Sequence, residues 1–441
     1  MPKLKILIAS LMILLKFALF IYPAIIITLI LFDPKLKTTG QSSLVPHWFG
    51  TTTYKFNHWA KEYIESKRAT TYKSTDVAAT EWPMFGAVFY LQSLRSLHEK
   101  GLIDIKQNHF QQALQYAVTI VSSPDTATWV KKRWKKRYLK TGISYLESEN
   151  VFYRMLLIMG LADYQAITKD KTYESLMNKQ YLSLYDELLR AKYHVRDDYP
   201  DECYPVDVLW ALEAIARANK LSQNPIDITP LKNAMLQTFD TTLKSKTSLP
   251  AFQVNSQTGA IIQEARGVGT SGMLFHVASL DINRAKKWYA SYEEHFLKSS
   301  DWFTGFREFP KGEPSFMDAD TGPIINEYGS VASLFAIGSS KSVGRIDHSA
   351  LLSIEAVAYA WPTPLGFLLP SLMGKVAVDS WALGDVALIY SMTREIKSDE
   401  VTAFEGSTPW SVWVILNLFL TLGSLLIWLE IRWIRKIRLG N

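Results

Sequence analysis

Residues 145–192 read YLESENVFYRMLLIMGLADYQAITKDKTYESLMNKQYLSLYDELLRAK and show most clearly how this chain folds. The first half, residues 145–168, is apolar at almost every position of a helical repeat. The second half, residues 171–192, places apolar residues three and four apart among Lys, Glu and Gln. A helix that is apolar all round is buried, and an amphipathic helix covers it. The stretch therefore predicts a hairpin of one buried and one covering helix.

The same pairing recurs along the chain. Apolar segments alternate with amphipathic segments, and successive pairs start about 55–70 residues apart. The predicted apolar helices are residues 76–98, 145–168, 205–220, 268–280, 323–340 and 380–394. The predicted covering helices are residues 47–69, 110–121, 171–192, 230–244, 283–299 and 347–360.

This alternation predicts an all-α protein. Six buried helices ringed by six covering helices form an (α/α)6 toroid of six helical hairpins. The alternative is an irregular α-solenoid, which also repeats helix pairs, although a solenoid has a more uniform repeat length. The irregular loops favour the toroid.

Composition excludes several classes of protein. The chain has 441 residues, of which 48% are hydrophobic, so it is neither disordered nor collagen-like. A single cysteine excludes a disulfide framework and any multi-cysteine metal site. We find no zinc-ligand spacing and no phosphate-binding loop, and the sequence predicts no metal and no cofactor.

Both ends of the chain carry apolar runs. Residues 6–32 are interrupted only by Lys16, and residues 410–429 contain no charge. A membrane-spanning helix needs about 20 such residues. The predicted organisation is a transmembrane helix in residues 1–32, an extracytoplasmic toroid domain in residues 33–409, and a transmembrane helix with a basic tail in residues 410–441. A cleaved signal peptide or a buried core helix is the alternative for these runs.

Basic residues flank both runs on their outer sides. Lys3 and Lys5 precede the first run, and four basic residues between 432 and 438 follow the second. The positive-inside rule therefore places both termini in the cytoplasm and the middle domain outside. We expect a two-span protein of a bacterial inner membrane, with the lipid bilayer as partner. The basic residues that flank the membrane segments then account for much of the net charge of +6, so we expect no nucleic-acid partner.

Acidic and aromatic residues gather where the predicted apolar helices begin, and these points meet at one mouth of a toroid. Such residues are also ordinary helix caps. The densest cluster is residues 197–207, where Asp207 lies inside an apolar helix and either pairs with Arg266 or Lys220 or faces the lumen. Repelling carboxylates raise one another's pKa, which produces an acid beside a base. The basic run 131–137 is predicted to be a solvated loop or a patch for anionic lipid or an acidic polymer.

These clusters supply the candidate site residues. The predicted catalytic residues are Asp207, Asp320, Glu202 and Asp318. The predicted substrate-binding residues are Trp82, Glu149, Tyr153, Tyr204, Arg266, Tyr328 and Trp381.

Several segments also resemble the linalool dehydratase/isomerase-like proteins. They are residues 148–154 (SENVFYR), 170–174 (DKTYE), 258–260 (TGA) and 318–322 (DADTG), in order within residues 131–345. The resemblance implies an (α/α)6 fold and a dehydration or isomerisation that uses two cysteines near the third buried helix. Here Cys203 is the only cysteine, and Asp207 is the polar residue nearest the second position. At the level of architecture the pattern is also similar to the six-hairpin glycosidases.

Three functions fit these observations. The first is a membrane-anchored extracytoplasmic hydrolase or lyase that acts on a glycan or cell-envelope polymer by carboxylate acid/base catalysis. The second is a hydro-lyase or isomerase acting on a small apolar alcohol, which requires a hydrophobic cavity lined by Cys203. The third is a non-catalytic polymer-binding or scaffold subunit that associates with other membrane subunits, in which the mouth carboxylates are all capped or paired.

Overall fold

The computed structural model describes residues 2–73, 77–142, 144, 146 and 148–439, and it is mostly helical. Asp76 and Tyr145, where two predicted helices begin, lie outside these residues. A helix is present in each of the twelve predicted segments. The apolar helices are α5 (Val77–Glu99), α8 (Val151–Thr168), α10 (Pro205–Leu221), α12 (Gly267–Leu280), α14 (Ser330–Ser342) and α17 (Leu383–Thr393). The covering helices are α4 (Val45–Glu65), α6 (Asn108–Ser122), α9 (Glu174–Arg190), α11 (Thr229–Asp240), α13 (Ile282–Phe296) and α15 (Ile346–Ala360).

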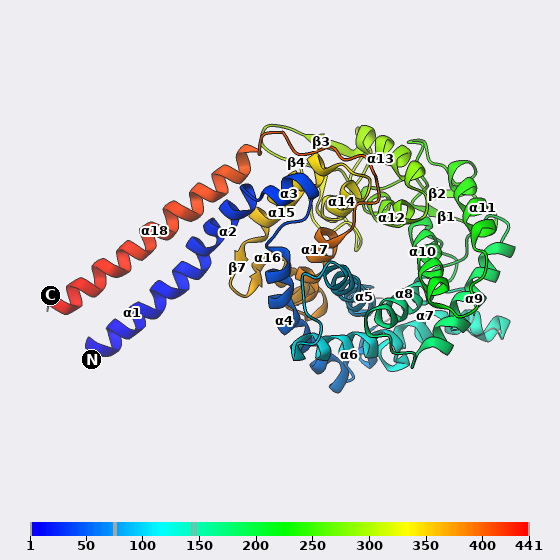
Figure 1. Cartoon of the computed structure of the whole chain (residues 1–441), viewed down its shortest axis with the longest axis horizontal. Helices are drawn as coiled ribbons and strands as arrows, with labels where there is room; N and C mark the ends of the chain where they lie inside the picture. Colours follow the sequence, from blue (N-terminus) through cyan, green and yellow to red (C-terminus); the bar gives the residue numbers. More distant parts are fainter. Residues whose placement is uncertain (1, 74–76, 143, 145, 147, 440–441) are drawn as a thin grey trace.

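The apolar helices pack against one another in chain order (Figure 1). Helix α5 contacts α8, α8 contacts α10, α10 contacts α12, α12 contacts α14, and α14 contacts α17. Helix α17 in turn contacts α5, so this series of contacts returns to its first member. Five covering helices lie against them: α4 packs on α17, α6 on α5 and α8, α9 on α8 and α10, α13 on α12, and α15 on α14, whereas α11 packs mainly on the covering helix α9.

The hairpin of α8 and α9 shows how sequence produces this packing. Nearly every residue of α8 is buried, including the charged Arg154, which is fully buried. Its guanidinium donates hydrogen bonds to Gln180 (2.9 Å) and Glu187 (2.8 Å) of α9. Because a buried charge is tolerated only when it is paired, these bonds fix how the covering helix lies on the apolar one.

Four short β-hairpins connect helices. They pair β1 (Gln253–Val254) with β2 (Ile261–Gln263), β3 (Leu297–Ser299) with β4 (Thr304–Phe306), β5 (Ile324–Ile325) with β6 (Tyr328–Gly329), and β7 (Pro362–Thr363) with β8 (Gly366–Phe367). The prediction of a helix from residue 323 is wrong in its first turns, because the turn residues Asn326 and Glu327 both have positive φ. Helix α14 therefore begins only at Ser330, after this hairpin.

Further helices lie outside the predicted pairs. They are α3 (Pro34–Thr39), α7 (Thr128–Thr141), α16 (Leu368–Val378) and the 3-10 turns η2 (Arg68–Thr70) and η3 (Pro124–Thr126). The basic run 131–137 is thus not a loop. It belongs to α7, which buries Trp129, Val130 and Trp134 on one face and exposes most of its lysines on the other.

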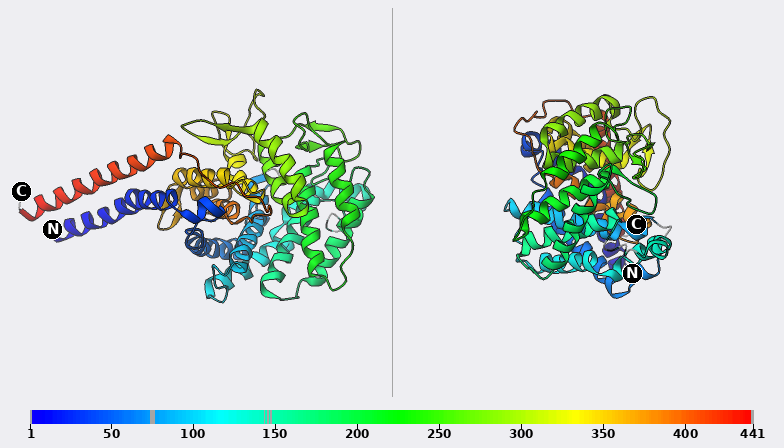
Figure 2. Two further views of the ribbon diagram at one scale, coloured as in Figure 1. Left: turned by 45° about the horizontal axis from the view of Figure 1, so that its top comes forward. Right: turned by 90° about the vertical axis from the view of Figure 1, so that its right-hand side faces the viewer.

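The two ends of the chain form a pair of helices that project from the body together (Figures 1 and 2). The first consists of α1 (Pro2–Lys16), a π-helical turn η1 (Phe17–Ile21) and α2 (Tyr22–Leu31), and the second is α18 (Trp410–Leu439). Within them, Leu4–Leu31 and Trp410–Arg438 are long and apolar enough to cross a membrane. Both chain termini lie at the end remote from the body (Figure 2). Lys16 is paired with Glu430 of α18 at 2.5 Å, which neutralises the one charge inside the first run.

One close approach gives a test of the packing. A Cβ atom added at Gly384, in the first turn of α17, would lie 1.9 Å from the backbone oxygen of Pro370 in α16. Gly384→Ala should therefore destabilise the protein by about 1–3 kcal/mol, the usual cost of overpacking. Gly50→Ala is the matched control, because a Cβ there meets nothing within 4 Å, and it should stabilise α4 by about 0.5–1 kcal/mol. Thermal unfolding in detergent measures both, and equal midpoints for the two variants would contradict this packing.

Candidate active site

A cavity of about 690 Å³ lies among the apolar helices, and each of the six contributes residues to its wall. This volume is in the range of natural small-molecule sites. Most of the wall is apolar, and its aromatic residues include Phe85 and Phe89 of α5, Trp210 of α10, Phe335 of α14 and Tyr390 of α17. The rings pack closely, with Phe89 and Tyr390 stacked at 4.0 Å between centroids. The deeper part of the cavity is therefore apolar and rigid.

The acidic residues of the cavity come from the starts of these helices and the loops before them. Glu81 lies in the first turns of α5, and Asp207 in the first turn of α10. Glu202 lies in the loop before α10, and Asp318 and Asp320 lie in the loop before β5. All four predicted catalytic residues thus line one cavity, together with the predicted binding residues Trp82 and Tyr204.

Asp318 is held by Arg266. The guanidinium donates to both carboxylate oxygens of Asp318 (2.8 and 3.1 Å) and to Glu308 (2.9 Å), and Arg266 is only 3% exposed. Burial raises the pKa of Asp318, but the hydrogen bonds and charge of Arg266 outweigh burial and leave this pKa below its usual range. Asp318 therefore stays ionised, and Arg266 acts by fixing it rather than by lining the cavity.

Asp207 and Asp320 differ from Asp318 because neither carboxylate has a hydrogen-bond or ion-pair partner among the described residues. Asp207 pairs with neither Arg266 nor Lys220; it is half-buried and faces the cavity. Loss of water contact raises the pKa of Asp207 well above its usual range, and the charges of Glu81 and Asp320 raise it further. The pKa of Asp320 is also raised, by desolvation and then by the charge of Asp318.

Glu81 also lines the cavity, although it is not among the predicted site residues. Its carboxylate accepts a hydrogen bond from Arg133 of α7 at 2.6 Å. Burial raises the pKa of Glu81 to about 7, although Arg133 opposes the shift. The Arg133 guanidinium also lies 4.6 Å from the ring centroid of Tyr199, which lines the cavity. Arg133 belongs to the basic run 131–137, but the sequence does not show which charges of this run point inward. The contact of α7 with the body shows that Arg133 does.

Other predicted binding residues do not line this cavity. Glu149 pairs with Arg137 at 2.7 Å, and Tyr153 is buried against Trp129. Tyr328 lies in β6 beneath the ammonium of Lys298, and Trp381 is 46% exposed between α16 and α17.

Cys203 is fully buried and is not part of the wall. Its backbone oxygen accepts a hydrogen bond from Val254 at 3.0 Å, so it belongs to the packing beneath the loop. Burial raises the pKa of its thiol well above the usual value, with further increases from neighbouring carboxylates. A thiol in this state is a poor nucleophile. Within the described part of the chain, no cluster of three or more His, Cys, Asp and Glu residues is arranged to hold a metal ion.

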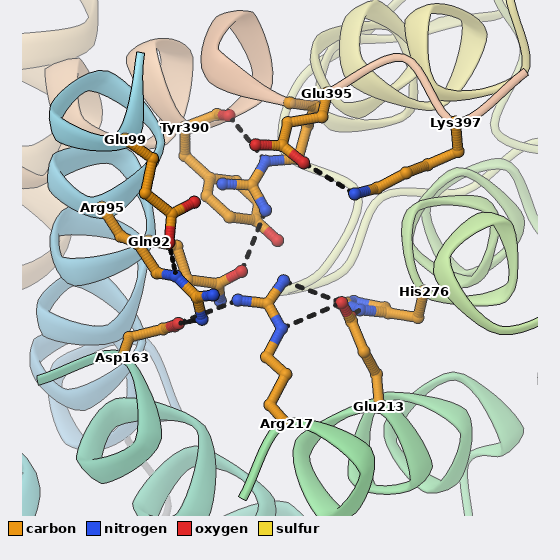
Figure 3. Close-up of polar contacts among 11 residues, drawn as sticks. Gln92, Arg95, Glu99, Asp163, Glu213, Arg217, His276, Tyr390, Glu395 and Lys397 are labelled. Carbon is orange, nitrogen blue, oxygen red and sulfur yellow. Dashed lines mark hydrogen bonds and ion pairs between the residues drawn. The ribbon is translucent and has the colours of Figure 1, made fainter. Parts of the chain in front are cut away.

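A charged network lies beside the cavity and reaches it through His276 (Figure 3). His276 lines the deep end of the cavity and its Nδ1 contacts Glu213. Glu213 accepts from Arg217 (2.7 Å), which also donates to Asp163 (2.9 Å). Asp163 in turn accepts from Arg95 (2.9 Å), which also bonds Glu99. Burial raises the pKa of Glu213, but Arg217 and His276 outweigh it, so the net pKa lies below the usual range and the group stays ionised.

This network predicts a large stability loss at Glu213. Glu213→Ala removes the carboxylate that pairs with the buried His276 and one of the two carboxylates that pair with Arg217, which keeps Asp163, and it should cost about 3–5 kcal/mol. Glu99→Ala is the control in the same network, because its half-exposed side chain should contribute less than about 1 kcal/mol. Because the Glu213 pKa is depressed, its stabilisation should also be lost as pH falls toward that pKa. Thermal unfolding at neutral and acidic pH tests this, and similar losses for both variants would refute the role of Glu213.

No protein-family model matches this chain, and a search of curated proteins finds no match either. The resemblance to the linalool dehydratase/isomerase-like proteins therefore rests on the sequence segments alone.

Proposed function

We propose that the helices form an (α/α)6 toroid with the cavity at its axis. The proposal is supported by the series of contacts that runs through the six apolar helices and returns from α17 to α5. A second support is that residues of all six helices line one cavity. A solenoid does not bring its first and last repeats together.

We further propose that the terminal helices anchor this toroid to a bacterial inner membrane as two antiparallel spans. Lys16 pairs with Glu430, and the side chains of Phe20 and Ile21 lie against Gly423, so the two helices contact each other along their lengths. With both basic flanks at the remote end, the positive-inside rule places the termini in the cytoplasm and the body outside.

The membrane arrangement predicts a protection pattern. In intact spheroplasts, external protease should leave epitope tags placed before Met1 and after Asn441 intact, and both should become sensitive once the membrane is permeabilised. Cleavage of either tag in intact spheroplasts would show that its terminus is outside.

As the activity, we propose acid/base cleavage of a glycan or related envelope polymer at the acidic mouth. The observation that carries this proposal is that Asp207 and Asp320, which lack side-chain partners among the described residues, line one cavity, where the charge of Asp320 helps to raise the pKa of Asp207. Asp207, with its strongly raised pKa, is assigned as the general acid that protonates the leaving oxygen. Asp320 is assigned as the carboxylate base or nucleophile. Asp318, fixed by Arg266, is assigned the role of positioning the loop that carries Asp320.

The shape and lining of the cavity fit a sugar. Aromatic rings such as Trp82, Tyr204 and Phe252 at its upper wall offer apolar faces on which pyranose rings stack. Carboxylates outnumber cationic side chains at the mouth, so a neutral or amino sugar suits it better than an acidic one. The apolar wall would also accommodate a small apolar alcohol, but the buried position of Cys203 weighs against that alternative. A purely structural scaffold would be expected to pair the half-buried Asp207, whereas Asp320 is exposed and needs no partner.

The assignment predicts activity losses at two positions. Asp207→Asn and Asp320→Asn should each lower the release of reducing ends from isolated envelope polysaccharide by about 10²–10⁴-fold. Asp201→Asn is the matched control, because Asp201 lies in the same loop as Glu202 but is 89% exposed and outside the cavity wall. Full activity in the Asp207→Asn variant, with unfolding midpoints unchanged, would refute this mechanism.

A further inference from the structure

The level of the membrane along the terminal helices can be set from α18. Its uncharged run, residues 410–429, spans about 30 Å, which equals the thickness of a bilayer core. Glu430 and Arg432 follow at once, and Arg435, Lys436 and Arg438 lie in the next turns. The apolar first half of α1 lies beyond the Lys16–Glu430 pair, so the first candidate span extends further on this side, to Leu4. Leu19, Phe20 and Phe419 lie well inside the two candidate spans, whichever helix is used to set the level.

Part of the body lies beside this interval. Trp361, which follows α15, donates its indole N–H to the backbone oxygen of Leu19 at 2.7 Å. Its ring packs against Phe20 (6.0 Å) and Phe419 (5.1 Å between centroids). Phe419 is nine residues beyond Trp410, about 13 Å along the helix and close to the middle of the run. Strand β7 also packs on α2, so the segment after α15 lies at the depth of the apolar core (Figure 1).

This same segment carries an exposed apolar surface. Leu365, in the turn between β7 and β8, is 75% exposed, and Val376 of α16 is 88% exposed. Leu369, Leu372 and Met373 are also exposed and lie with Val376 at the three- and four-residue intervals of one helix face. We call these five residues the α16 face. Exposed apolar side chains in such a contiguous group mark an interaction surface rather than ordinary surface.

Exposed charged residues border the α16 face at its C-terminal end, whereas Lys55, beside Ser371, is mostly buried and paired with Asp385. Lys375 pairs with Asp379, which also pairs with Arg68 of η2, and the three groups are at least partly exposed. Such a polar edge beside an apolar helical face is typical of a helix that lies in the plane of a membrane interface.

From the depth of Trp361, the contact of β7 with α2 and the place of the α16 face in the segment that follows Trp361, we propose that the α16 face is immersed in the body-side leaflet and contacts lipid acyl chains. The toroid is then held against the bilayer by a third element besides its two spans. This inference rests on the two-span arrangement proposed above, and it does not depend on the reaction at the mouth.

Lipid quenching tests the proposal on the full-length protein. Cys203 is the only cysteine and is buried, so bimane can be attached selectively to Val376→Cys and Leu365→Cys, with the unmutated chain measuring background labelling. Each labelled protein is reconstituted in phosphatidylcholine/phosphatidylglycerol vesicles with ordinary or brominated acyl chains. Leu418→Cys, on the exposed side of α18, is the positive control, and Leu182→Cys, exposed on α9 far from the spans, is the negative control (Figure 1).

We expect brominated lipid to quench the probes at 376 and 365 to a similar extent as at 418, and to leave the probe at 182 unchanged. Quenching at 418 but not at 376 and 365 would overturn this inference alone. An unquenched but blue-shifted probe at 376 would assign the face to a second copy or another subunit, and would also overturn it. Loss of quenching at 418 as well would overturn the two-span arrangement, and with it this inference.

Discussion

The burial of six helices that have almost no polar side is the constraint on which the other features depend. Helices such as α8 and α12 must be covered on every side, so each packs on two apolar neighbours and on an amphipathic helix. Helices packed in this way leave a cavity between them, which aromatic side chains narrow but do not fill. The first turn of α10 brings Asp207 to that cavity, and the loop before β5 brings Asp320.

Burial also determines which charged residues are held in ion pairs and which remain available for a reaction. Beside the cavity, Glu213, Arg217 and Asp163 neutralise one another, as the cost of a buried charge requires. At the mouth, Arg266 satisfies Asp318, whereas Asp207 and Asp320 keep their carboxylates directed at the cavity with a raised pKa. The paired charged residues therefore stabilise the fold around the cavity. The unpaired carboxylates, Asp207 and Asp320, are those suited to proton transfer.

Periodicity predicted the twelve helices because burial repeats along each of them, and it placed Asp207, Asp320 and Trp82 at the start of apolar helices. It missed α7, whose lysines concealed a buried face carried by only three residues, and with it the inward charge of Arg133. The positive φ of Asn326 and Glu327 has no periodic signature, so Tyr328 was assigned to a helix instead of a hairpin. A side chain at a helix start either lines the cavity or packs outward, as Tyr153 does. The rotation of the helix about its own axis decides between the two, and tertiary packing sets that rotation.

The central claim is that the mouth keeps Asp207 protonated beside an ionised partner. Infrared difference spectroscopy, comparing the intact protein with Asp207→Asn across a pH titration, reports the carboxylic acid C=O band of this one residue. The account predicts that the band persists at pH values well above the ordinary aspartate pKa of about 3.9. Disappearance of the band near that ordinary value would show that Asp207 is a normal solvated carboxylate, and would contradict the proposed acid/base site.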